Sequence, residues 1–287
     1  MSIFLLLIVC CICINNLVMK LMMDKGYAPE TLTFTFFCFA GIFAAAVSCF
    51  WADRFVLSPK IVMLGILAGV AGAVATQNFM RALATGLYSY INVIIPGSFI
   101  IPVIYSIVVW NETIKIEGWV GIGLVLLSLL LLALANNGSK HQGKDKVRFG
   151  IWLMAVGLCF IFNGLAQVVH SEAAKYIQRQ FLGFITTFYL TGIIGTVVTN
   201  YGKKLFIREV IPGSVIMAMI SVTSFMLTMT VLTKLSPAVV FPFTVGAPVI
   251  VGLVLSKYLF HEKVNTIGYA GIVAGIAGIV FLYFATI

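Results

Sequence analysis

The chain alternates long apolar runs with short polar breaks from one end to the other. Runs of about 20 apolar residues are long enough to cross a bilayer as α-helices. Most of the breaks between them are only a few residues long. The predicted spans are ten: 2–22, 31–52, 58–82, 87–110, 116–136, 148–171, 180–201, 211–233, 237–259 and 264–286. The pattern therefore predicts an all-α integral membrane protein with ten transmembrane helices.

The second half of the chain repeats the first at a nearly constant offset. Because each half holds five spans, an odd number, the second copy must enter the membrane from the opposite side, which is typical of transporters. We therefore divide the chain into two inverted repeats, residues 1–137 and 148–287, joined by a polar linker. The matches are Glu112 with Glu262, Gly118 with Gly268 and Gly121 with Gly271 at an offset of 150, and Asn15 with Asn163 at 148.

Composition excludes an ordinary soluble domain, because 61% of the residues are hydrophobic and only 9% are charged, against about a quarter charged in soluble proteins. The net charge of +9 lies in the connections between spans, so it predicts orientation in a lipid bilayer and no nucleic-acid partner. The six cysteines lie inside apolar runs without metal-ligand spacing. They therefore predict neither a disulfide framework nor a metal site.

Orientation follows from the basic residues. Loops after odd-numbered spans carry 12 of the 18 Lys and Arg residues, and loops after even-numbered spans carry 6. The positive-inside rule then places both termini outside the cytoplasm.

Polar side chains at membrane depth are the candidate substrate contacts, because a carrier must replace the water around a polar solute. The first and third spans run in the same direction, so their ends meet the start of the fourth span on one side of the membrane. We expect one polar vestibule there, formed by Asn15, Asn16, Gln77, Asn78, Arg81, Tyr88 and Asn92.

The second half predicts a matching vestibule on the other side. Asn163, Gln167 and His170 are spaced i, i+4 and i+7 on one face of the sixth span, and Ser224 and Thr228 are i, i+4 on the eighth. Aromatic side chains of the fourth and ninth spans would suit a partly apolar or cationic solute. The plainer alternative is that these polar groups only bond neighbouring helices. The aromatic candidates are Tyr88, Tyr90, Phe241 and Phe243.

Prolines and glycines occupy corresponding places in the two halves. Pro96 and Pro102 lie in the fourth span and Pro242 and Pro248 in the ninth, where each removes a backbone donor and predicts a kink or hinge. The fifth and tenth spans are glycine-rich, so we expect them to pack together or against a second protomer as a homodimer.

The acidic residues lie at the ends of spans. We assign Glu112 and Glu262 to interfacial turns or helix starts and expect Glu172 and Lys175, which end the sixth span, to be solvated.

These motifs resemble the EamA-type domain of the drug/metabolite transporter (DMT) superfamily over essentially the whole chain. The segments that carry the resemblance are ALATGLYSYINVIIP with NETIKIEGWVGIGLVLLSLLLL, and LTKLSPAVVFPFTVGAP with HEKVNTIGYAGIVAGIAGIVFL. Each copy has a basic residue near the end of the third helix, a kinked fourth helix, a Glu at the turn and a Gly-rich fifth helix. The resemblance implies a central cavity lined by spans 1, 3, 4, 6, 8 and 9. It also implies cytoplasmic termini, against the charge distribution, so the orientation stays open.

The expected function is secondary transport of a small polar metabolite, such as an amino acid or amine, by alternating access in a bacterial cell membrane. A translocase for a lipid-linked or amphipathic substrate is the alternative, since inverted repeats fit both. An intramembrane enzyme would need paired acids or a His/Asp pair at one depth, and the sequence has neither. It also lacks an ATP-site motif, so we expect no cofactor and no pumping by hydrolysis.

Overall fold

The regular elements are all helical in the part of the chain that the structure, a computed structural model, describes: residues 2–51, 55–85, 95–111, 113–136, 146–177, 181–259 and 266–284. The first half contains α1 (Ser2–Asp24), α2 (Pro29–Phe50), α3 (Pro59–Thr85), the 3₁₀ turn η2 (Pro96–Phe99), α5 (Ile100–Trp110) and α6 (Ile116–Asn136). The second half contains α7 (Lys146–Ile177), α8 (Leu182–Thr199), the 3₁₀ turn η3 (Arg208–Val210), α9 (Ile211–Leu232), α10 (Pro237–Leu259) and α11 (Thr266–Phe284).

Six helices in the described part of the chain are long and apolar enough to cross a membrane. Their apolar spans are Ile3–Met23, Pro29–Phe50, Pro59–Ala82, Ile151–Tyr176, Leu182–Thr199 and Arg208–Leu232. The prediction of an all-helical membrane protein is therefore confirmed. The other four predicted spans coincide with η2 and α5, α6, α10 and α11, which contain shorter apolar helices.

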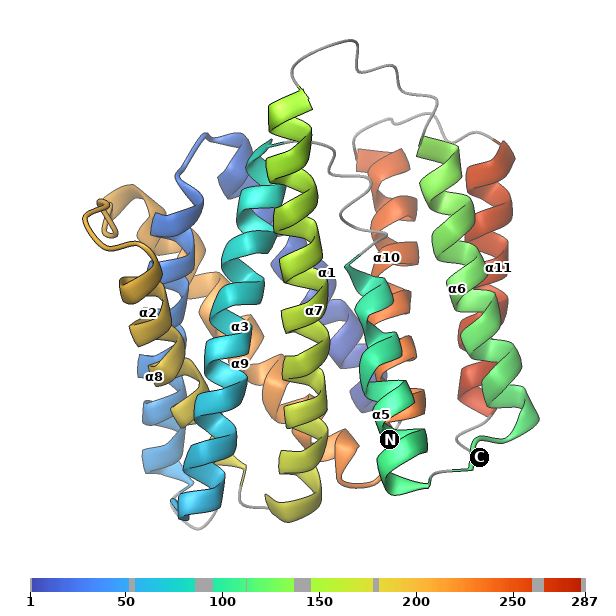
Figure 1. Cartoon of the computed structure of the whole chain (residues 1–287), viewed down its shortest axis with the longest axis horizontal. Coiled ribbons are helices and arrows are strands. Elements are labelled where there is room, and N and C mark those ends of the chain that lie inside the picture. Colours follow the sequence, from blue (N-terminus) through green and yellow to red (C-terminus); the bar gives the residue numbers. More distant parts are fainter. Residues whose placement is uncertain are drawn as a thin grey trace.

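Successive helices run up and down through one bundle (Figure 1). We call the end where α1 begins and α11 ends the lower end, as it lies in Figure 1, and the opposite end the upper end. The C-terminal ends of α3 and α8 and the N-terminal end of α2 lie at the upper end. The C-terminal ends of α5 and α7 lie at the lower end.

Aromatic contacts join α2, α8 and α9, and α3 packs against α8 and α2. Phe37, on α2, and Phe184, on α8, are almost completely buried. Glycine lets α3 approach α8 closely: a Cβ at Gly69 would lie 2.6 Å from the backbone oxygen of Phe188. Close packing of aliphatic and aromatic groups replaces lipid contact over this face of the bundle.

η2 begins at Pro96 as a 3₁₀ turn and α5 follows from Ile100; the start of the predicted fourth span lies outside the described residues, so a break at Pro96 stays a prediction. Pro102 does not kink a helix as predicted, because it lies in the first turn of α5, where its missing N–H would have no intrahelical acceptor. Pro242 and Pro248 both lie inside α10. Each therefore leaves one carbonyl of the preceding turn without its usual donor.

The glycine-rich helices α6 and α11 pack together, as predicted (Figure 1). Ser128 donates its hydroxyl to the backbone oxygen of Gly271 at 2.7 Å. A Cβ at Gly278 would lie 2.9 Å from the backbone nitrogen of Val125 and 3.0 Å from the backbone oxygen of Gly121. The two backbones are thus too close at Gly278 for any side chain.

Gly278→Ala should lower the free energy of unfolding by about 1–3 kcal/mol, because the added methyl group meets backbone atoms that cannot turn away. Gly123→Ala is the control on the same helix pair, since nothing lies within 4 Å of a Cβ at that position. Alanine there should be neutral or stabilise by less than about 1 kcal/mol. Thermal unfolding of both variants in detergent tests the close packing of α6 against α11, and equal melting temperatures would contradict it.

Candidate functional site

Three polar side chains lie on one face of α7, as their spacing predicts. Asn163 Nδ2 donates to the hydroxyl oxygen of Ser98 at 2.7 Å, and Gln167 Nε2 approaches the same oxygen at 3.4 Å. Ser98 belongs to η2 and is completely buried, and Gln167 is only 7% exposed. Asn163 lies near the middle of α7, which has 32 residues and is about 48 Å long. The turn after Pro96 thus places a hydroxyl against two amides at membrane depth.

His170 continues this face toward the lower end and lies among three phenylalanines. Its ring centroid is 4.6 Å from that of Phe225, on α9. Phe184 and Phe188, on α8, approach it edge-on at 5.9 and 5.6 Å. We call Ser98, Asn163, Gln167 and His170 together the central cluster. Its lower part is therefore an imidazole surrounded by aromatic rings.

Three buried polar atoms of predicted site residues have no hydrogen-bond partner within the described part of the chain. They are Asn15 Oδ1, Gln167 Oε1 and His170 Nε2. A buried polar atom without a partner costs about 1–3 kcal/mol, and such atoms are uncommon in native structures. Asn15 lies near the middle of α1, as Asn163 does in α7. These atoms mark the places where a bound polar solute would gain hydrogen bonds.

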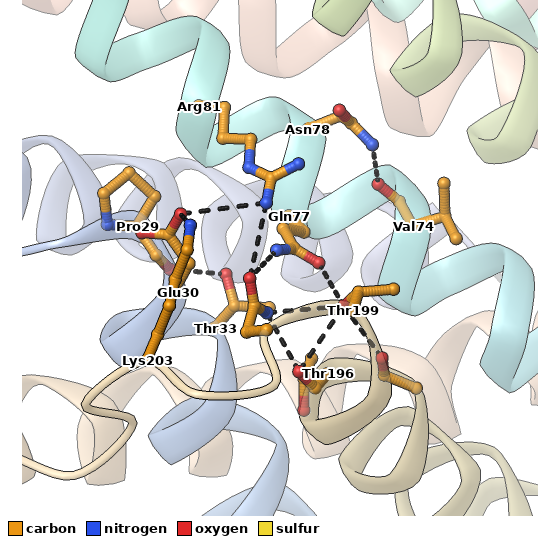
Figure 2. A network of polar contacts seen from close by, with 12 residues as sticks. Pro29, Glu30, Thr33, Val74, Gln77, Asn78, Arg81, Thr196, Thr199 and Lys203 are labelled. Carbon is orange, nitrogen blue, oxygen red and sulfur yellow. Dashed lines mark hydrogen bonds and ion pairs between the residues drawn. The ribbon is translucent and has the colours of Figure 1, made fainter.

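A second polar group closes the upper end, and Figure 2 shows it. Gln77 donates to Asn200 Oδ1 and accepts a hydrogen bond from the hydroxyl of Thr199 at 2.7 Å. Arg81 Nη2 lies 3.3 Å from the same Asn200 oxygen and 3.7 Å from Glu30 Oε1. We call this group the upper network; it consists of Glu30, Gln77, Arg81, Thr199, Asn200 and Lys203, which also contacts Glu30.

The contacts described for the upper network tie α3 to α2 and α8. Gln77 and Arg81 do lie on one face, as their spacing predicts, but their partners come from other helices. Asn78 lies beside them and donates to Val74 O, on its own helix, at 2.8 Å. The nitrogen and the oxygen of the Gln77 amide both form hydrogen bonds with protein groups, whereas Gln167 Oε1 has no hydrogen-bond partner among the described residues. We therefore treat the upper network as structural and the central cluster as the candidate site.

Glu172 is held by protein groups at the lower end, so the expectation that it is solvated is wrong. Its Oε1 accepts hydrogen bonds from the Tyr105 hydroxyl at 2.7 Å and from Trp110 Nε1 at 2.8 Å. Lys175 is exposed, but its Nζ lies 3.1 Å from the centroid of the Trp110 ring. These contacts join α7 to α5, and α7 ends at Ile177, beyond the predicted end of the span at residue 171. We call these four residues the lower clasp.

The other predicted site residues are less informative. Ser224 is buried, and its backbone oxygen accepts the Thr228 hydroxyl within α9 at 2.8 Å. Phe243 is buried in α10, and Asn16 is half-buried on α1. Several predicted positions lie outside the described residues: Tyr88, Tyr90, Asn92, Glu112 and Glu262.

Sequence reasoning missed the groups that complete these clusters. Ser98 could have been found from its place just after Pro96 in the broken fourth span. Phe184, Phe188 and Phe225 are ordinary apolar positions in the sequence, so no local signal separates them from the core. Asn200 lies at the end of the predicted seventh span, 180–201, and no spacing in the sequence links it to Gln77.

Comparison with known proteins gives the fold and no family. No family model matches the chain, and no curated protein matches it. In fold, 28 solved chains match it. One of them, described as "Crystal structure of protein", superposes with a TM-score of 0.72 at 12% identity and covers 98% of this chain and 96% of its own. At that identity the match shows a shared fold.

Two buried glutamines provide a matched test of which polar group is structural. Gln77→Leu should destabilise the folded protein by about 1–3 kcal/mol, because it removes both hydrogen bonds of a buried amide. Gln167→Leu should change the unfolding free energy by less than about 1 kcal/mol, because it removes one long hydrogen bond together with an unpaired oxygen. Thermal unfolding in detergent measures both variants. An equal loss of stability would contradict the distinction.

Proposed function

We propose that this chain is a secondary carrier for a small polar metabolite, of the EamA type in the DMT superfamily, that works by alternating access. The observation that carries the proposal is the central cluster with its unpaired Gln167 oxygen at membrane depth. A protein that only needed helix contacts would gain stability by filling this place with an apolar side chain. A carrier keeps such groups because they replace the water around its solute.

The packing of the helices supports two inverted repeats of five helices each. In that assignment α1, α2 and α3 correspond to α7, α8 and α9. η2 with α5 corresponds to α10, and α6 corresponds to α11. Exchanging the halves turns the contact of α3 with α7 into that of α9 with α1. By the same exchange, the α3–α8 contact becomes the α9–α2 contact, and the α5–α7 contact becomes the α10–α1 contact. All of these contacts are present. Such an arrangement is expected of two repeats related by an axis in the membrane plane.

Residue pairs in the contact between α6 and α11 also agree with this assignment. The hydroxyl of Ser128 contacts the backbone oxygen of Gly271. At an offset of 150 the equivalent pair is Gly278 and Gly121, and a Cβ at Gly278 would lie 3.0 Å from the Gly121 oxygen. The same crossing thus occurs twice, once with a serine and once with a glycine.

Unequal contacts between equivalent pairs suggest how access alternates. The α3–α7 contact is more extensive than its counterpart, the α1–α9 contact. An inverted repeat can reach the opposite-facing state by exchanging the conformations of its halves. In the proposed cycle α3 and α7 separate as α1 and α9 close, while the central cluster stays between them. The lower clasp, which joins α5 to α7, would hold one state until the solute binds.

Transport can be measured directly after reconstitution into proteoliposomes. We expect exchange of at least one labelled compound from a panel of small amino acids, amines and amides. Gln167→Leu should reduce the exchange rate at least about tenfold while leaving the protein folded, since it removes a solute contact. Thr223→Val is the control, because Thr223 is exposed on α9 and its hydroxyl bonds only Met219 O, within its own helix.

Two results would contradict the carrier. One is folded wild-type protein that exchanges no compound in the panel. The other is Gln167→Leu protein with the same exchange rate as Thr223→Val protein. Flipping of a fluorescent lipid analogue without metabolite exchange would instead favour a lipid translocase.

A further inference from the structure

The hydroxyl of Ser98 sets the direction of both amides in the central cluster. Asn163 Nδ2 and Gln167 Nε2 both point at this oxygen. A carboxamide is planar, so an amide whose NH₂ group faces Ser98 turns its oxygen away from it. Gln167 Oε1 is therefore presented as an acceptor, and it is buried with no partner among the residues that the structure describes. Each NH₂ group keeps a second N–H, but the buried amide atom that lacks a partner within the described residues is an acceptor oxygen.

The contacts described for the central cluster include no positively charged side chain. The central cluster itself contains no Lys, Arg, Asp or Glu. Arg81 lies at the upper end, where Glu30 and Asn200 contact its guanidinium group. A carboxylate or phosphate ligand has no proton to donate, so its oxygens would face the lone pair of Gln167 Oε1. Sites built to hydrogen-bond one group strongly reject an analogue that lacks it.

The aromatic surroundings of His170 extend the argument. Phe184, Phe188 and Phe225 lie within 6 Å of its ring, measured between centroids. Their carbon surfaces suit a small apolar body, and ring faces also attract a cation. Phenylalanine rings have no hydrogen-bond donor for an anion. The cluster thus combines acceptor oxygens with apolar walls.

We propose that the solute presents N–H donors and carries no net negative charge, as a primary amide or amine on a small apolar body does. This inference rests on the proposed carrier function and names the class of solute at the same site. Gln167 Oε1 accepts a hydrogen bond from the solute, Ser98 positions the amide that accepts it, and the rings around His170 cover the apolar part.

Pairs of compounds with the same shape but different charge test the inference. Suitable pairs are nicotinamide with nicotinate, benzamide with benzoate, asparagine with aspartate, and glutamine with glutamate. In each pair whose amide is exchanged, the amide should compete for exchange of the labelled compound at least about tenfold better than the corresponding acid in the proteoliposome assay. The rise in melting temperature on adding each compound should follow the same order, since binding stabilises the folded state.

Two variants separate the role of Ser98 from a general loss of folding. Ser98→Ala frees both amides to rotate, so the preference for amide over acid should shrink by about threefold or more while exchange persists. If that variant does not fold, Gln167→Glu serves instead. It is isosteric, and its added negative charge should shift preference from nicotinamide toward 3-(aminomethyl)pyridine, which is a cation at neutral pH. Thr223→Val should leave the preference unchanged.

The outcomes distinguish this inference from the proposed function. Exchange that favours the acids, or a preference unchanged by both Ser98→Ala and Gln167→Glu, would overturn the assigned solute class and leave the carrier intact. Exchange of neither amides nor acids nor amines by folded protein would overturn the carrier itself, and the solute class with it.

Discussion

Hydrogen-bond satisfaction away from water is the constraint on which this structure depends. A bilayer offers no partner to a polar group, so every amide or hydroxyl inside the bundle must find one in the protein or remain unpaired at a cost. Most of the side chains here find theirs locally. Thr35 and Thr244, for example, donate to backbone oxygens one turn earlier in their own helices. Polar groups that bond across helices therefore indicate which helices are held together. Buried polar groups without a partner indicate where a ligand could bind.

The two buried glutamines show the contrast most clearly. Gln77 and Gln167 have similar burial and the same chemistry, and each lies on a long apolar helix. Gln77 is bonded on both sides of its amide, within a network that also contains an ion pair between Lys203 and Glu30. Within the described residues, Gln167 is bonded on one side of its amide only. The first arrangement fixes the positions of α2, α3 and α8, and the second leaves capacity for a ligand.

The sequence predicts those features that depend on local spacing. The polar face of Asn163, Gln167 and His170 follows from helical periodicity, and the pairing of the glycine-rich helices follows from smooth small-residue faces. It does not predict partners that the tertiary structure supplies. Ser98 reaches Asn163 from the 3₁₀ turn that begins at Pro96, and Glu172 is bonded because Tyr105 and Trp110 come to it from another helix. Whether Tyr88 and Asn92 join the site stays a prediction.

The measurement that tests the central claim most directly is a cryo-electron microscopy structure in lipid nanodiscs with the compound that most raises the melting temperature. The account predicts density for that compound within hydrogen-bonding distance, about 2.7–3.2 Å, of Gln167 Oε1 and in contact with the rings around His170. Density elsewhere in the bundle, or a protein group paired with Gln167 Oε1 in the bound state, would contradict it.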